Sequence, residues 1–146
     1  EKFTLTGQSS SCTESQSLWA IPLSIICQSS ITKPVLYWLF ENREMTFSLK
    51  VPPTQWFKLN PCMVGYYRVC YSPELLSKFL PAIANHSIPP LDRLGLLSDL
   101  FALVLAGKQT TVELFRFMTV FKAEQNYSVW CELNSILDKF SQLFDV

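Results

Sequence analysis

A chain of 146 residues is long enough for one hydrophobic core of ordinary size or two small ones. Its 12 lysines and arginines balance its 12 aspartates and glutamates and are scattered, which argues against a binding surface for nucleic acid or an acidic membrane. Charged residues make up only 16% of the chain, against roughly 25% in a typical domain. We therefore expect a piece of a larger protein whose neighbouring parts cover apolar surface.

The first 71 residues predict short strands separated by polar residues and prolines. The strand-like runs are KFTLT, LWAIPLSIIC, VLYWLF, MTFSLKV, WFKLN and VGYYRVCY. Their spacing favours a small antiparallel β-sandwich over residues 1–71. Within it, Pro22 is expected at a sheet edge or a bulge, because proline cannot donate to a ladder. The serine-rich segment 8–17 is predicted to be a mobile loop.

The junction that follows is predicted to be a hairpin leading into a helix. Residues 56–60 and 64–71 alternate as strands do, on either side of Pro61. In the second run the alternation places Tyr67, Val69 and Tyr71 on one face and Val64, Tyr66, Arg68 and Cys70 on the other. Ser72-Pro73-Glu74 then combines a capping hydroxyl, a first-turn proline and an early acid, which is a helix start.

Residues 72–146 predict about four helices joined by short loops, as in a helical solenoid. Pro81 is expected to end or kink the first helix. Pro89-Pro90 opens the second, which is apolar almost all round and should be central; Gly107 should close it. Thr110 and Glu113 form a predicted capping box for the third helix, which extends to about residue 123.

The last helix is predicted from about Tyr127 to Phe144 and carries a wide apolar stripe. The residues of the stripe are Val129, Trp130, Leu133, Ile136, Leu137, Phe140, Leu143 and Phe144. One neighbouring helix would not cover all of them. We therefore expect self-association through this helix if nothing else packs on it.

No constellation of residues predicts catalysis or metal binding, so we expect no catalytic, cofactor-binding or metal-binding residue in this chain. Zinc sites need three or four ligands, whereas His86 is the one histidine and H-E-x-x-H is missing. We expect His86 to be a solvent-facing loop residue. A dyad of His86 with Cys62 or Cys70 has no local support.

Two further patterns leave alternatives open. Asn85-His86-Ser87 and Asn126-Tyr127-Ser128 match the acceptor pattern for N-glycosylation, which is short and often fortuitous. A second group of residues could stack on a ligand, although packing is the favoured interpretation without interleaved basic residues. These aromatic residues are Trp56, Tyr66, Tyr67 and Tyr71.

Cysteine usage points to a reducing compartment. Five cysteines at irregular spacing, without a C-x-x-C pair, do not suggest a disulfide framework. They are Cys12, Cys27, Cys62, Cys70 and Cys131. We expect them to be small buried hydrophobic residues, and the chain to be cytoplasmic.

Three stretches together carry a family resemblance that spans essentially the whole chain. They are WFKLNPCMVGYYRVCYSPELL, IPPLDRLGLLSDLFALVLAGKQTTVELFRFM and EQNYSVWCELNSIL. The chain resembles the gluzincin zinc aminopeptidase family, and within it the cytosolic, puromycin-sensitive branch. One departure is Cys62, since the family usually has glycine two residues after the asparagine of K-L-N.

The resemblance implies a non-catalytic role. In the family, the zinc ligands and the catalytic residues belong to a preceding domain, so none of them maps onto this chain and zinc belongs to the parent enzyme. The matching part is the sandwich and first helices of a bowl-shaped helical domain, whose partners are the catalytic domain, the remaining helices and peptide substrates. The alternatives are a stand-alone protein-interaction module and, least supported, a self-contained hydrolase.

Overall fold

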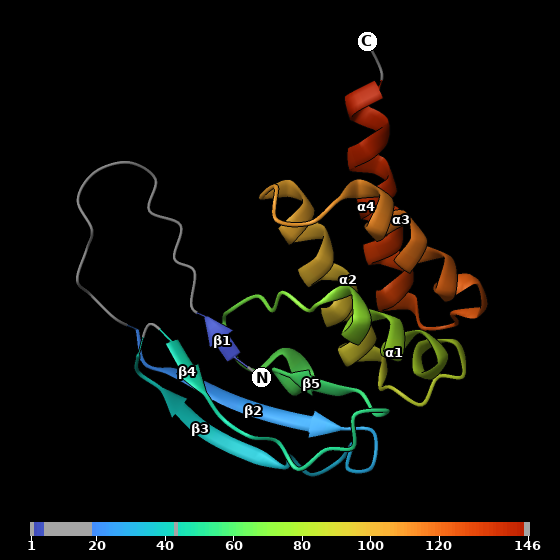
Figure 1. Ribbon diagram of the computed structural model, residues 1–146. Coiled ribbons are helices and arrows are strands. Elements are labelled where there is room, and N and C mark those ends of the chain that lie inside the picture. Colours follow the sequence, from blue (N-terminus) through green and yellow to red (C-terminus); the bar gives the residue numbers. More distant parts are fainter. Residues whose placement is uncertain (1, 5–18, 43, 145–146) are drawn as a thin grey trace, which may run out of the picture. The chain divides into compact units, whose positions relative to one another are not determined.

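The computed structural model describes residues 2–4, 19–42 and 44–144 (Figure 1). The predicted mobile loop at residues 8–17 lies outside these ranges. The chain forms two compact units, Glu1–Leu59 and Asn60–Val146. The sequence pattern predicts a domain boundary after Tyr71, and the first α-helix begins at Pro73.

The first unit contains two antiparallel sheets. Strand β1 (Lys2–Thr4) pairs with β4 (Glu44–Thr46) in a two-stranded sheet. Strand β2 (Ile21–Cys27) lies between β3 (Leu36–Phe40) and β5 (Phe57–Leu59) in a three-stranded sheet (Figure 1). Strands thus precede the helices, which confirms the predicted α+β class.

Strand β2 supplies the centre of this sheet because its apolar run is buried on both faces. Ile25 pairs with Leu36 of β3 on one side and with Leu59 of β5 on the other. Pairing with β5 covers residues 25–27, so among the described residues Pro22 has a ladder partner on the β3 side alone. The expectation that Pro22 occupies a local edge is confirmed, since its missing N–H breaks no second ladder.

The second unit contains the four predicted helices. They are α1 (Pro73–Ala84), α2 (Pro90–Leu105), α3 (Thr111–Met118) and α4 (Tyr127–Phe144). A 3₁₀ turn, η2 (Thr119–Ala123), continues α3. Helix α2 contacts both α3 and α4, and its residues Leu96, Leu97, Leu100 and Phe101 are buried. The prediction that the second helix is central is confirmed.

Local signals in the sequence define most helix ends as predicted. Ser72 Oγ accepts the N–H of Leu75 over 3.3 Å at the start of α1. The capping box of α3 is complete, because Thr110 and Glu113 each accept from the other's backbone N–H. Gly107 follows α2 with φ +66° and closes it by the paired backbone bonds of a Schellman motif.

The hairpin predicted for this region is wrong, and so is one of the two alternatives for Pro81, that it ends the first helix. Helix α1 does not end at Pro81 but continues to Ala84, because buried Phe79, Ala82 and Ile83 hold both sides of the proline in the core. Residues 64–71 form no strand, so the hairpin is absent. The side chain of Asn60 bonds both polar groups of Gly65 instead, donating to its oxygen over 2.8 Å and accepting its N–H over 2.7 Å.

The predicted alternation in residues 64–71 nevertheless matches their burial. Val69 and Tyr71 are buried and Tyr67 is half-buried, whereas Val64, Tyr66, Arg68 and Cys70 are exposed. The segment is extended enough to alternate, but the backbone N–H of Val69 bonds to Asp99 of α2 rather than to a strand.

Candidate functional site: buried polar anchors on helix α2

Helix α2 carries three charged residues in an otherwise apolar setting. Asp92, Arg93 and Asp99 are all buried. An unpaired charge in such a position is strongly unfavourable, so each requires a partner. We call these three residues the α2 anchors, because each holds another segment of the second unit.

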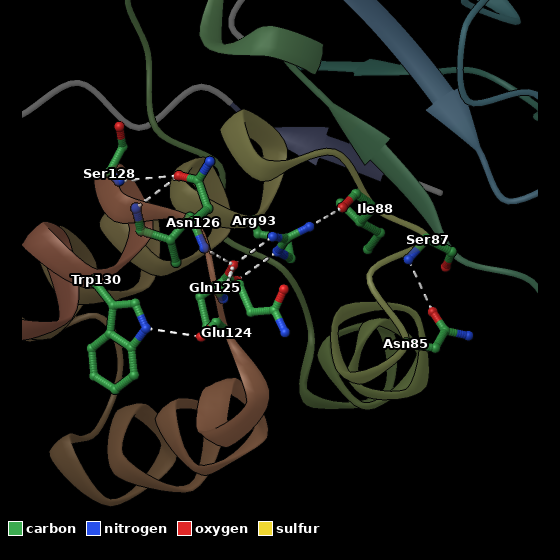
Figure 2. Close-up of polar contacts among 10 residues, drawn as sticks. Asn85, Ser87, Ile88, Arg93, Glu124, Gln125, Asn126, Ser128 and Trp130 are labelled. Carbon is green, nitrogen blue, oxygen red and sulfur yellow. Dashed lines mark hydrogen bonds and ion pairs between the residues drawn. The ribbon is translucent and has the colours of Figure 1, made fainter.

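Arg93 forms the most enclosed of these contacts (Figure 2). Its Nε donates to Oε2 of Glu124 over 2.7 Å and its Nη2 donates to Oε1 over 2.6 Å. Its Nη1 donates to the carbonyl oxygen of Ile88 over 2.6 Å. The side chains of Arg93 and Glu124 are only 4% and 1% exposed. This bidentate geometry is the strongest form of an arginine–carboxylate pair.

Glu124 is further held by the chain that follows it. Its Oε1 accepts the backbone N–H groups of Gln125 and Asn126, over 3.0 and 2.9 Å. Burial alone would raise the pKa of Glu124, but the bonds from Arg93 and from these two amides outweigh burial and lower the pKa to about 2. A carboxylate so fully bonded is a poor general base, because its lone pairs and its charge are already engaged.

The same stretch positions the start of α4. Trp130 donates its indole N–H to the carbonyl oxygen of Glu124 over 2.9 Å, and Asn126 Oδ1 accepts the N–H groups of Ser128 and Val129 (Figure 2). The entry into α4 is thereby connected to α2 through Glu124. The sequence offered one signal that we did not use, namely charged residues at positions 92 and 93 of an apolar helix.

The two aspartates of α2 hold the segment that precedes α1. Asp92 Oδ1 accepts the backbone N–H of Cys62 over 2.8 Å. Asp99 accepts the backbone N–H of Val69 over 3.2 Å and the Arg68 guanidinium over 3.1 Å. Asp99 thus supplies the acceptor that a neighbouring strand would have supplied, which explains why residues 64–71 alternate without forming a strand.

The aromatic residues proposed as a stacking platform do not share one surface. Tyr66 is fully exposed, whereas Tyr71 is buried and packs edge-on against Phe79 with ring centroids 5.2 Å apart. Burial and, second, the charge of Asp99 raise the pKa of Tyr67 to about 12. Tyr67 therefore stays protonated at neutral pH. Trp56 is buried and belongs to the first unit.

The remaining candidate residues show no shared chemistry. His86 is exposed, as predicted, and ends α1 with φ +59°. Cys70 contacts Gln109, whose Nε2 lies 3.4 Å from Sγ. Within residues 2–4, 19–42 and 44–144, no three histidine, cysteine or acidic side chains are placed to hold a metal ion. The expected absence of catalytic residues remains a prediction.

The cysteines correct one expectation. Cys27 is buried, but Cys62, Cys70 and Cys131 are exposed, and all four are free thiols. Cys12 lies outside the described residues. The expectation of buried cysteines is therefore wrong for three of the four, because these three occupy the outer side of a turn, an alternating segment and a helix.

The two glycosylation patterns occupy different settings. Asn85 is exposed, and its Oδ1 accepts the N–H of Ser87 over 3.0 Å (Figure 2). Asn126 is half-buried and caps α4. In the part of the chain that the structure describes, no helix combines the length and apolar character that crossing a membrane requires.

Comparison with known proteins places these features in a family. Residues 56–146 match the family described as "ERAP1-like C-terminal domain". The chain is 33% identical to puromycin-sensitive aminopeptidase of Caenorhabditis elegans over 84% of its length, and 33% identical to aminopeptidase M1-A of rice over 82%. Human aminopeptidase N is 30% identical over 88% of the chain. The matched regions are only 13–14% of the length of these relatives.

Proposed function

Because the chain belongs to the ERAP1-like C-terminal domain family, we propose that it is a non-catalytic segment of an aminopeptidase-like protein. Its relatives are named as aminopeptidases, and the chain corresponds to a small share of their length. Zinc and the reacting groups would then belong to another domain. The sandwich-like strands and first helices of this chain would form a structural connection next to it.

The observation that carries this proposal is the set of α2 anchors. Arg93 connects α2 to the start of α4, while Asp92 and Asp99 hold the segment before α1. All three charged side chains form hydrogen bonds or ion pairs with other groups of the chain. Such an arrangement suits a segment that holds neighbouring helices in fixed positions, and it leaves none of these three groups for a substrate.

We assign to this rigid connection the task of positioning further helices over the active site of the parent enzyme. There they would limit access to peptides and exclude large folded substrates. The partners would be the catalytic domain and the remaining helical domain. The four free thiols support a reducing compartment such as the cytoplasm as its location.

One observation favours a second function, a stand-alone protein-interaction module. Trp130 and Leu137 lie on α4 with 41% and 47% of their surfaces exposed, although Val129, Leu133 and Ile136 on the same helix are buried. The predicted apolar stripe therefore has an uncovered side. An amphipathic helix with such a side can take a protein partner as well as another part of its own protein.

An activity and metal assay tests the first proposal. We expect the purified chain to release no amino acid from chromogenic aminoacyl substrates and to retain no stoichiometric zinc after dialysis. The rice or nematode relative, purified in parallel, is the positive control. Turnover that a chelator abolishes, or one zinc per chain, would contradict a non-catalytic role.

A chimera separates positioning from interaction. Residues 56–146 would replace the matching segment of the Caenorhabditis relative, and hydrolysis of short and long peptides would be compared. Retained activity that Arg93→Ala lowers for long peptides more than for short ones would support positioning. A well-folded chimera with unchanged activity in both variants would favour the interaction module.

A further inference from the structure

Strand β3 is an edge strand among the strands that the structure describes. The three-stranded sheet has the order β3-β2-β5, so β3 pairs with β2 on one side only (Figure 1). Along the other side of β3, every second residue directs its backbone N–H and C=O groups outward, where any extended chain could pair with them.

The side chains of this edge make it unusual. Tyr37, Trp38 and Leu39 are 71%, 54% and 50% exposed, which means that both faces of β3 are accessible. No charged residue or proline occurs from Val35 to Phe40. Edge strands of monomers normally carry such residues to prevent pairing, and their absence marks this edge as a site for another strand.

We propose that β3 pairs antiparallel with β3 of a second copy of this chain, which joins two three-stranded sheets into one continuous sheet. This inference goes beyond the proposed function and does not depend on it. A two-fold axis at Trp38 brings the two Trp38 side chains opposite each other. It also sets Tyr37 of each copy opposite Leu39 of the other, an aromatic–aliphatic cross-strand pair.

Charge complementarity at the strand ends favours this occupant. With Trp38 opposite Trp38, Glu41 of one copy faces Val35 of the other and is diagonal to Lys33. Both Glu41 and Lys33 are exposed, and diagonal neighbours across a ladder lie about 7–8 Å apart, within reach of long side chains. The symmetry repeats this contact at both ends.

The exposed area predicts a weak dimer. Aromatic side chains bury 150–250 Å² when fully covered, so Tyr37 and Trp38 each leave roughly 100–150 Å² accessible. With Val35 and Leu39, two copies could bury on the order of 1,000 Å², at the lower limit of specific interfaces. We therefore expect association that depends on concentration in the micromolar range.

Sedimentation velocity over a concentration series tests the proposal on the whole chain. We expect a monomer–dimer equilibrium in which Leu39→Lys raises Kd by more than about tenfold, because the lysine would be buried against the partner strand. The control substitution elsewhere, Tyr66→Lys on the alternating segment, should leave Kd within about twofold. Leu137→Lys on α4 tests the alternative, association through that helix. Circular dichroism checks that each variant is folded.

Cross-linking tests the register. Trp38→Cys, introduced after Cys12, Cys62, Cys70 and Cys131 are replaced by serine, should form a disulfide-linked dimer on mild oxidation. Tyr66→Cys in the same background should not. This pair of variants reports directly whether residue 38 lies at the two-fold axis.

The remaining outcomes overturn the proposal. A strict monomer at the highest soluble concentration would exclude self-pairing of β3. A dimer lost through Leu137→Lys but not through Leu39→Lys would assign association to α4. Protection of β3 amides from hydrogen exchange only after another polypeptide is added would show that a foreign strand occupies the edge.

Discussion

The backbone N–H of Cys62 donates to the buried carboxylate of Asp92 over 2.8 Å, while Cys62 itself holds φ at +57°. A left-handed conformation costs a residue with a Cβ roughly 1–2 kcal/mol, and glycine avoids this cost. The family resemblance described in the sequence analysis leads us to expect glycine at this position. The turn thus has a backbone geometry that suits glycine, and the side chain of Cys62 makes this geometry less favourable.

We predict that Cys62→Gly stabilises the second unit by up to about 1 kcal/mol, since relief of the left-handed strain exceeds the entropy that glycine adds to the unfolded chain. Denaturant melts would measure the change in free energy of unfolding. The matched control is Cys62→Ala, which removes the thiol but keeps the Cβ and should not stabilise. Equal gains in both variants would mean that the thiol, not the backbone, is responsible.

Removing one partner of the Arg93–Glu124 pair should be far worse than removing both. Arg93→Met leaves a buried carboxylate unpaired, and we expect a loss of about 3–5 kcal/mol in the free energy of unfolding. Arg93→Met combined with Glu124→Leu should recover a large part of that loss, because no buried charge is left. Chemical denaturation of four proteins completes the test, namely the parent chain, the Arg93→Met and Glu124→Leu single variants and the double variant. A double variant as unstable as the sum of its single changes would show that the pair is not coupled.

The lowered pKa of Glu124 predicts a loss of stability in acid. The pKa falls from an ordinary 4.5 to about 2 in the folded chain, so the stabilisation is complete above pH 4.5 and disappears as the pH falls through 2. Its size is up to about 3 kcal/mol. Thermal melts between pH 6 and pH 2 should show this dependence, and the double variant at positions 93 and 124 should show less of it. Identical pH profiles would contradict the assignment.

Burial on α2 predicts a clear ranking of three alanine variants. Leu97→Ala and Phe101→Ala should each lose roughly 2–5 kcal/mol, because both side chains are buried and would leave a cavity. Lys108→Ala should stay within about 0.5 kcal/mol, since Lys108 is exposed. Urea titrations with equal slopes would make the three values comparable, and equal losses would refute a central position of α2.

The helical half of the fold was predictable because its signals are local. The caps at Ser72 and Thr110, the glycine at 107 and the apolar faces each involve residues within one or two turns. The absence of a strand at residues 64–71 was not predictable, because alternation reports which side chains are buried but not what the backbone bonds to. That partner, Asp99, lies about 30 positions further along the chain.

The same limit explains what was missed at the α2 anchors. The charges of Asp92 and Arg93 are visible in the sequence, but their partners Cys62 and Glu124 are each 30 or 31 positions away. Exposure of Cys62, Cys70 and Cys131 was missed for a related reason. Residue type predicts average burial, whereas the outer side of a turn or helix is decided by packing.

The attachment of residues 62–69 to α2 limits the distance that these residues can span. Cys62 and Val69 are seven positions apart, as are their acceptors Asp92 and Asp99. Seven residues of helix advance about 10 Å, whereas seven extended residues would cover about 23 Å. The connecting chain therefore has slack and must fold back on itself, as it does where Asn60 bonds Gly65. An extra residue within this slack should be absorbed, but one inserted between the two aspartates would rotate the second by about 100° away from its partner. The spacing of the two aspartates along the helix therefore fixes the separation of Cys62 and Val69, and the chain between these two residues adjusts to that distance.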